Sequence, residues 1–376
     1  MSTKTSGQAR DRFAKNRAPM SVLPFLRALA ESGGSDLHCK VGSPPRIRVD
    51  GRLRHLDVPA LSASDTEHMA HEVLRSDLVD KFDETNEADF AYSMKTVGRF
   101  RVNAFRQRGS VGLVFRAVLM GAVPLSELGL PDVVAPLSLE PRGLVLVTGP
   151  TGCGKTTTLA GMVDHINRTR EVHIVTIEDP IEVLHTDDVA MINQREVHVD
   201  TASFAVAMRA AMRQDPDVIL VGEMRDLETV RAAISAAETG HFVMSTLHTV
   251  DAEETIARII DFFPPHEQRQ ARLSLAGSLR GILCQRLVPK KGEEGRVVAM
   301  EVCINTGRVA DAIADAEKTS TICQLVAEGS YYGMQTFDQH LTKLFAEGVI
   351  TMDAALACST NPHDLAVELR RLGLAT

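Results

Sequence analysis

The segment GPTGCGKT, residues 149–156, has the residue types and the spacing of a phosphate-binding loop. Its glycines allow backbone N–H groups to curl around phosphate oxygens, and the helix expected to start at Lys155 adds partial positive charge. The Lys155 ammonium would reach the β- and γ-phosphates of a nucleotide, and the Thr156 hydroxyl would bind Mg²⁺. The residues expected to bind the nucleotide are Gly149, Pro150, Thr151, Gly152, Cys153, Gly154, Lys155, Thr156 and Thr157.

Carboxylates follow two apolar segments that read as buried strands, residues 173–178 and 218–221. The first ends in Glu178 and Asp179, and the second is followed by a glycine and then Glu223. Ligands of open parallel sheets lie outside the carboxyl ends of the strands, so Glu178 and Asp179 are candidates for binding the metal or its waters. Glu223 would then polarise an attacking water as a general base. The alternative, in which the Glu-Asp pair only caps a turn, stays open here.

A histidine ends a third apolar segment, HFVMSTLHT, residues 241–249. In a parallel sheet this segment would end at the same edge as the phosphate-binding loop. His248 is therefore a candidate sensor of the γ-phosphate, and a purely structural histidine is the alternative.

Arginines recur in two further segments that read as strands. In GRFRVNAFRQR, residues 98–108, the alternation places Arg99, Arg101 and Asn103 on one face and the apolar residues on the other. Arg116 belongs to the next segment, SVGLVFRAVL. These arginines either coat a solvated sheet face or deliver positive charge to the hydrolysis of a phosphoanhydride. The residues alone do not decide between the two readings.

Residues 21–119 have the pattern of a small α+β domain. SVLPFLRALAE has the apolar spacing of a helix, and the pair Asp50-Gly51 is a strong hairpin signal between two strands. A second helix is expected over residues 62–80, because Ser62 and a nearby aspartate stand in capping positions. Three strands follow, in ADFAYSM, GRFRVNAFRQR and SVGLVFRAVL.

Three further segments precede and follow this domain. Residues 1–20 are polar and basic and are expected to be a disordered tail, and residues 120–130, rich in Pro and Gly, are expected to be a linker. Strands alternate with helices in residues 131–376, which predicts an α/β domain with a mostly parallel sheet. From Ala252 onward the pattern is mainly helical.

Composition narrows the classes of protein that fit. The net charge of -8 gives no overall electrostatic reason to bind nucleic acid, and 4% aromatic residues without Trp do not favour base stacking. No apolar run approaches the length of a membrane span. The cysteines lie too far apart for zinc spacing and are expected to be free thiols in a reducing cytosol. They are Cys39, Cys153, Cys284, Cys303, Cys323 and Cys358.

With GPTGCGKT, TIEDPIE, VGEMRD and STLHT in this order, the chain resembles the secretion ATPase superfamily. It is most similar there to type IV pilus retraction ATPases, the PilT/PilU-like twitching motility proteins. The resemblance runs from about residue 35 to residue 364 and includes GSDLHCKVGSPPRIRVDGRL, MRQDPDVILVGEMRDLETVRAAISAAETGH and MQTFDQHL. It implies a RecA-like P-loop ATPase domain preceded by a small α+β PAS-like domain, with ATP and Mg²⁺ as ligands.

The resemblance also implies roles for matching residues. Residues 149–156 correspond to the Walker A loop, and TIEDPIE corresponds to the Asp box. VGEMRD corresponds to an atypical Walker B motif whose glutamate, Glu223, activates water, and STLHT corresponds to the His box with His248. Arg101 and Arg116 match two arginines that reach nucleotide phosphates as the domains close.

A hexameric motor is the implied function, one that couples Mg-ATP hydrolysis to type IV pilus retraction. The implied partners are other copies in a homohexamer, an inner-membrane pilus platform protein and a related motor ATPase, with no direct nucleic acid. The implied location is cytoplasmic, at the inner face of the cell membrane through a protein partner. Retraction ATPases carry an AIRNLIRE-like motif where residues 308–329 read RVADAIADAEKTSTICQLVAEG. An accessory or assembly-type ATPase of a pilus or type II secretion-like system therefore stays open, with a nucleic-acid translocase less favoured.

Overall fold

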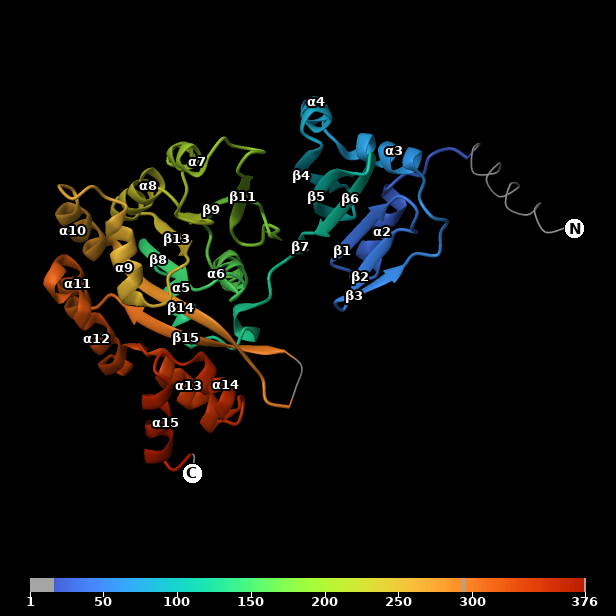
Figure 1. Ribbon diagram of the computed structural model, residues 1–376. Coiled ribbons are helices and arrows are strands. Elements are labelled where there is room, and N and C mark those ends of the chain that lie inside the picture. Colours follow the sequence, from blue (N-terminus) through green and yellow to red (C-terminus); the bar gives the residue numbers. More distant parts are fainter. Residues whose placement is uncertain (1–16, 293–294, 375–376) are drawn as a thin grey trace, which may run out of the picture. The chain divides into compact units, whose positions relative to one another are not determined.

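The computed structural model describes residues 17–292 and 295–374, and the chain divides after Met120 into two units (Figure 1). Most of the tail expected over residues 1–20 lies outside the described residues. Its last residues are held to the first unit, because Arg17 Nη2 and the Met20 N–H both donate to the Asp65 carboxylate, at 3.0 and 2.8 Å.

The first unit has, within its described residues, a six-stranded sheet in the order β3-β2-β1-β6-β5-β4. Neighbouring strands run antiparallel in the pairings between β2 and β3, β1 and β2, β1 and β6, β5 and β6, and β4 and β5. Its elements are α2 (Leu23–Glu31), β1 (Asp36–Lys40), β2 (Arg46–Val49), β3 (Arg52–His55), α3 (Ala63–Val73), α4 (Ser76–Thr85), β4 (Glu87–Met94), β5 (Gly98–Gln107), β6 (Ser110–Ala117) and β7 (Leu119–Met120).

Two local sequence signals in this unit are confirmed. Asp50 and Gly51 both have positive φ, 48° and 74°, which is the geometry of the tight hairpin turn expected between β2 and β3. In β5 the alternation holds as well. Phe100 and Val102 are buried, whereas Arg101 between them is exposed.

The single helix expected over residues 62–80 is wrong, because it is two helices, α3 and α4. Its start is confirmed, since Ser62 and Asp65 form a reciprocal capping box. The chain then turns extended at Leu74 and Arg75, whose ψ angles are 130° and 151°. Arg75 donates to Asp77 in the first turn of α4, where an acid also stabilises the helix N-terminus.

The second unit is an α/β structure around one large sheet, in the order β11-β9-β12-β13-β8-β14-β15 within the described residues. Its first part contains η2 (Leu125–Glu127), α5 (Val134–Ser138), β8 (Gly143–Thr148), α6 (Lys155–Thr169), β9 (His173–Glu178), β10 (Val183–Leu184), β11 (Met191–Glu196), α7 (Phe204–Ala211), β12 (Val218–Val221), α8 (Leu227–Glu238) and β13 (Phe242–Leu247). Its second part contains α9 (Ala252–Asp261), α10 (Gln268–Ser278), β14 (Leu279–Pro289), β15 (Arg296–Ile304), α11 (Gly307–Ala314), η3 (Ala316–Thr321), α12 (Ile322–Glu328), η4 (Ser330–Tyr332), α13 (Phe337–Ala346), α14 (Met352–Cys358) and α15 (Pro362–Arg371).

The expectation of a mainly helical pattern from Ala252 onward missed β14 and β15. β14 runs parallel to β8 in the sheet, and β15 runs antiparallel to β14 at its edge. β14 is buried at five consecutive positions, from Gly281 to Gln285, so it lacks the alternation that identifies a strand with one solvated face. The outer edge of β15 is itself occupied, because the Met300 N–H donates to His340 Nδ1 at 2.9 Å.

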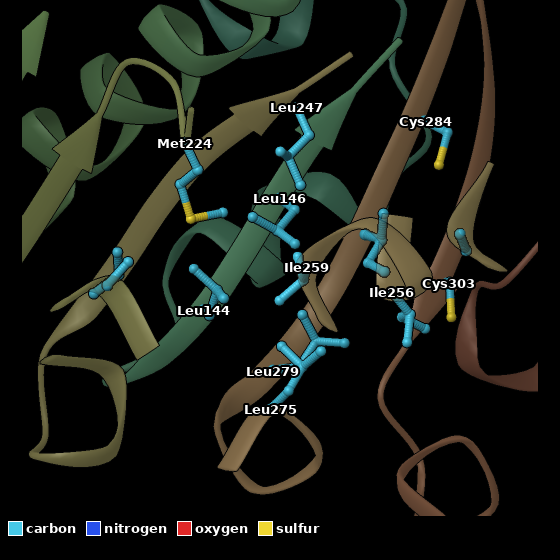
Figure 2. Close-up of a cluster of buried hydrophobic side chains, with 14 of the residues drawn as sticks. Leu144, Leu146, Met224, Leu247, Ile256, Ile259, Leu275, Leu279, Cys284 and Cys303 are labelled. Atoms are coloured by element: carbon cyan, nitrogen blue, oxygen red, sulfur yellow. The ribbon is translucent and has the colours of Figure 1, made fainter. Parts of the chain in front are cut away.

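Apolar side chains fill both faces of the sheet. Leu144 and Leu146 of β8 face one core cluster, whereas Val145 and Val147 face the other, so this strand is buried on both sides. Figure 2 shows the first cluster, in which the leucines of β8 lie near side chains of α9, α10 and β14. The segment expected to be a linker, residues 120–130, contributes Leu125 to the other cluster.

No helix within residues 17–292 and 295–374 combines the length and the apolar character that crossing a bilayer requires.

Candidate active site

A cavity of about 750 Å³ lies in the second unit, where four parallel strands end. The register places the last residues of β8, β9, β12 and β13 side by side, so the segments that follow these strands meet at one edge of the sheet. The lining includes side chains from each of these segments: Thr151, Lys155, Thr156, Thr157, Glu178, Asp179, Glu223, Arg225 and His248. An edge of this kind is where open parallel sheets bind their ligands.

The glycine-rich loop needs its glycines for both backbone angle and space. Gly149, Gly152 and Gly154 have φ values of 139°, 78° and 94°, which side chains rarely adopt. A Cβ at Gly149 would also collide with the carbonyl oxygen of Gln285 in β14. The loop therefore packs directly against β14 and runs into α6 at Lys155, the strand–loop–helix arrangement of a phosphate-binding site.

Lys155 points back over this loop. Its Nζ donates to the carbonyl oxygens of Gly149 and Pro150, at 2.7 and 3.2 Å, and lies 3.4 Å from Nδ1 of His248. Burial lowers the pKa of Lys155, and the negative charge of Glu223 acts in the opposite direction. Thr156 and Thr157, in the first turn of α6, are exposed to the cavity, so their hydroxyls are free to face a bound ligand.

The two acids at the end of β9 have different surroundings. Glu178 is buried, and its Oε1 accepts bonds from the Thr176 hydroxyl at 2.6 Å and from Gln194 Nε2 at 3.2 Å. Burial raises the pKa of Glu178, because an ionised carboxylate loses hydration there. The side chain of Asp179 is 30% exposed, with Oδ2 lying 3.8 Å from Nη1 of Arg225.

Glu223, which follows β12, has both carboxylate oxygens engaged. Oε2 accepts a bond from Arg225 Nε at 2.8 Å, and Oε1 lies 3.1 Å from His248 Nε2. Because His248 also lies next to Lys155, a chain of polar contacts runs from the phosphate-binding loop through His248, Glu223 and Arg225 to Asp179. Gly222 lets the end of β12 lie close to β9, since a Cβ there would lie 3.3 Å from the carbonyl oxygen of Ile177.

Two side chains that line the cavity have oxygen atoms suited to a divalent ion. Within the described residues no group of three or more His, Cys, Asp and Glu side chains is placed to hold a metal. The Thr156 hydroxyl and the Asp179 carboxylate line the cavity and are hard oxygen ligands, which fit Mg²⁺ with phosphate oxygens and waters completing its shell.

The two arginines expected to contact phosphate belong to the first unit. Arg101 and Arg116 are exposed and lie directly opposite each other in β5 and β6. Arg116 Nε donates to Asp36 Oδ1 at 2.9 Å, and Arg48 lies 3.5 Å from the other oxygen of the same carboxylate. The Asp36 carboxylate therefore contacts two arginines of this unit, Arg116 and Arg48.

Two residues of the site were missed in the sequence. Arg225 belongs to the segment VGEMRD, but its position between Glu223 and Asp179 depends on two strands that are far apart in the chain. Gln285 contacts the glycine-rich loop from β14, a strand that was not expected. The run ILCQRLV followed by a Gly-containing loop and RVVAMEVCI was the available signal, since two such apolar runs around a turn indicate a hairpin.

Comparison with known proteins gives a consistent set of relatives. The family model for Type II/IV secretion system proteins matches residues 99–351. The chain is 45% identical over 336 residues to the type IV pilus retraction ATPase PilT of Pseudomonas aeruginosa, covering 89% of this chain and 97% of that protein. It is 41% identical over 351 residues to the type IV pilus ATPase PilU of the same organism, covering 93% and 92%.

Solved structures of a pilus motor and of an ATPase are similar to this chain as well. A crystal structure of the pilus retraction motor PilT with bound ADP is similar with a TM-score of 0.85 and 45% identity, covering 93% of this chain and 99% of that one. The ATPase DotB of Legionella pneumophila is similar with a TM-score of 0.73 and 27% identity, covering 91% and 96%.

Proposed function

Because the chain belongs to the Type II/IV secretion system protein family and is an ATP-hydrolysing enzyme, we propose that it is a motor that couples hydrolysis of Mg-ATP to retraction of type IV pili. The observation that carries the proposal is the similarity to PilT of Pseudomonas aeruginosa over nearly the full length of both proteins. The cavity at the strand ends supports it, since the loop, the acids and the histidine of a phosphoanhydride hydrolase line one space.

In the proposed reaction, the phosphates bind over the loop of residues 149–156. Lys155 exchanges the neutral carbonyls of Gly149 and Pro150 for anionic phosphate oxygens, which are stronger partners for an ammonium. Mg²⁺, held by the Thr156 hydroxyl with Asp179 nearby, would neutralise charge that develops on the phosphates.

Glu223 takes the role of general base in this proposal. Its carboxylate is oriented on one side by Arg225 and on the other by His248, so the direction in which it can accept a proton from water is restricted. His248 lies between this base and Lys155, where it can report the presence of a γ-phosphate. Glu178 is already engaged by Thr176 and Gln194, so it supports the strand end rather than serving as the first choice of metal ligand.

The proposed working assembly is a homohexamer at the cytoplasmic face of the membrane. An inner-membrane pilus platform protein would attach it there, and a related motor ATPase is a further proposed partner. Arg101 and Arg116 would deliver positive charge to the phosphates during the catalytic cycle, which suits two exposed cations placed side by side.

An accessory pilus ATPase is the second candidate. The similarity to PilU covers as much of the chain as the similarity to PilT. In addition, residues 308–329 depart from the AIRNLIRE-like motif of retraction ATPases, and within them α11, η3 and the residue between these helices carry the acids Asp311, Glu317 and Asp315.

Deleting the gene in the organism that encodes the chain tests the proposal. A retraction motor leaves cells with excess pili and without twitching, and re-expression of the wild-type chain, but not of Glu223→Gln, restores movement. Bald cells would identify an assembly ATPase, and unchanged pili would contradict a role in pili.

A biochemical test separates the remaining rival. The purified full-length chain should hydrolyse Mg-ATP at a rate that single-stranded DNA does not change. Strong stimulation by single-stranded DNA would instead indicate a nucleic-acid translocase.

A further inference from the structure

Gln285 is a fully buried polar side chain in β14, and its two side-chain hydrogen bonds go to the glycine-rich loop and to the helix α6 that follows it. Its Nε2 donates to the carbonyl oxygen of Cys153 at 2.7 Å, and its Oε1 accepts a bond from the Thr158 hydroxyl at 3.0 Å. The first partner lies in the glycine-rich loop and the second in the first turns of α6. One side chain thus connects β14 to the loop and to the helix that the loop enters.

The main chain around Gln285 is equally close to the loop. β14 pairs with β8 up to Cys284 and Thr148, so Gln285 stands beside the first residue of the loop, Gly149. A Cβ at Gly149 would collide with the Gln285 carbonyl oxygen, and a Cβ at Gly154 would lie 3.2 Å from Gln285 Nε2. The glycines of the loop are therefore needed for contact with this residue as well as for backbone angle.

The bond to Cys153 sets the orientation of a peptide group that faces the phosphates. In a trans peptide the carbonyl and the following N–H point in opposite directions. Because the Cys153 carbonyl points at the buried Gln285 amide, the Gly154 N–H points away from β14. The phosphate-binding function of such a loop depends on the direction of these N–H groups.

β14 is a firm support for this contact, because Arg286, the residue after Gln285, attaches the strand to helices near the C-terminus. Arg286 Nη1 donates to the carbonyl oxygen of Cys358 at 2.6 Å, and its guanidinium lies 3.9 Å from the ring centre of Phe337. Successive residues of a strand point to opposite faces, so Gln285 and Arg286 hold different parts of the second unit.

We propose that Gln285 is a positioning residue of the nucleotide site, one that holds the Cys153–Gly154 peptide of the phosphate-binding loop in the orientation that binds phosphate. This inference rests on the proposed function, since it concerns the same nucleotide site. It predicts that loss of the Cys153 bond weakens nucleotide binding, whereas loss of the Thr158 bond alone does not.

The test compares Mg-ADP binding by full-length variants. Gln285→Glu keeps an acceptor for Thr158 but removes the donor to Cys153, and it should weaken Mg-ADP binding about ten-fold, the factor that corresponds to one lost buried hydrogen bond. Thr158→Val removes only the other bond and should stay within about two-fold of wild type. Where Gln285→Glu does not yield folded protein, Gln285→Met, of equal chain length, replaces it with the same expected loss.

Gln335→Met is the matched control for a purely structural effect. Gln335 Nε2 donates to the Met300 carbonyl oxygen at 2.9 Å, so this variant also removes a glutamine hydrogen bond at the β14–β15 hairpin without touching the loop. It should lower the unfolding temperature and leave Mg-ADP affinity unchanged. Equal affinity in Gln285→Glu and wild type, or equal weakening in the Gln285 and Gln335 variants, would overturn the proposal.

Turnover gives a second readout. Saturating Mg-ATP itself pulls the loop into its binding orientation, so kcat of Gln285→Met should fall less than kcat/KM. An equal fall in both would contradict a positioning role. If the wild-type chain binds Mg-ADP in a Gln285-dependent way but does not hydrolyse Mg-ATP, the proposed function fails while this inference stands.

Discussion

The Arg225 guanidinium donates a hydrogen bond from Nε to Oε2 of Glu223 across 2.8 Å. Its Nη1 lies 3.8 Å from Asp179, so one cation joins the acid that follows β12 to the acid that follows β9. The other carboxylate oxygen of Glu223, Oε1, is also engaged, because it lies 3.1 Å from Nε2 of His248. The orientation of the proposed general base therefore depends on Arg225.

Arg225→Gln should lower turnover at least ten-fold while leaving Mg-ADP affinity within about two-fold of wild type. The reason is that a neutral side chain no longer orients the Glu223 carboxylate, whereas the phosphate-binding loop is untouched. Steady-state ATP hydrolysis and nucleotide titration measure the two quantities. Arg209→Gln is the control, because it breaks a comparably exposed ion pair with Glu228 on neighbouring helices. Unchanged turnover in Arg225→Gln would show that Glu223 does not need this partner.

Lys155→Met should weaken Mg-ADP binding by at least about 100-fold. Its ammonium is the cation nearest to the loop carbonyls, and charge-assisted hydrogen bonds to phosphate are each worth about 1.5–3 kcal/mol. The methionine keeps the length of the buried stem, so the unfolding temperature without nucleotide should change little. Retained affinity would mean that phosphate binds elsewhere in the cavity.

The local parts of the fold and of this site could be predicted from the sequence. The glycine-rich loop and the Asp50–Gly51 turn are dictated by residue types at fixed spacing, because only certain backbone angles satisfy them. The positions of Glu178, Glu223 and His248 near strand ends could be predicted from apolar runs that alternate with helices. The structure places all three around one cavity.

Long-range parts of the site could not be predicted in this way. The bond from Gln285 to Cys153 joins residues 132 positions apart, and it exists because β14 inserts beside β8. Nothing in the buried run around Gln285 distinguishes a strand from a helix by periodicity alone. The break after α3 was missed for a related reason, since Leu74 is buried and continues the apolar pattern of the helix although its backbone is extended.

Arg101→Gln should lower ATP turnover without lowering the stability of the protein. Arg101 faces Arg116 across β5 and β6, and like charges directly opposite each other are unfavourable, so removing one should leave the free energy of unfolding unchanged or raise it by a few tenths of a kcal/mol. If the arginine meets nucleotide phosphate during the cycle, turnover falls at least ten-fold all the same. Urea unfolding and ATP hydrolysis by the assembled protein measure the two effects.

Arg52→Gln, on the exposed strand β3 of the same sheet, is the control for a general loss of positive charge. It should leave turnover unchanged. Full activity in Arg101→Gln would assign Arg101 to the solvated face of the sheet.

Glu301→Gln should reveal a buried acid through the pH dependence of stability. Burial raises the pKa of Glu301 from 4.5 to about 7, partly offset by the bond that its Oε1 accepts from the Ala252 N–H at 2.9 Å. Below pH 7 the folded carboxyl is mostly neutral, whereas the unfolded one ionises above pH 4.5, so its stabilising effect is complete below pH 4.5 and is lost as the pH rises to 7, by up to about 3 kcal/mol. Glutamine stays neutral and still accepts the Ala252 bond. The stability of the variant relative to wild type should therefore increase from pH 4.5 to 7 and level off above that.

Urea unfolding at several pH values between 4.5 and 8 measures this difference directly. Burial also lowers the pKa of His340, to about 4, and its stabilising effect is lost as the pH falls from 6.5 toward 4, which is the opposite sign. Because His340 is present in both proteins, its effect cancels in the difference between them. Glu347→Gln, at an exposed position after α13, is the control for the same exchange outside the core. A flat difference for Glu301→Gln would mean that burial does not raise the pKa of the Glu301 carboxyl in the folded protein.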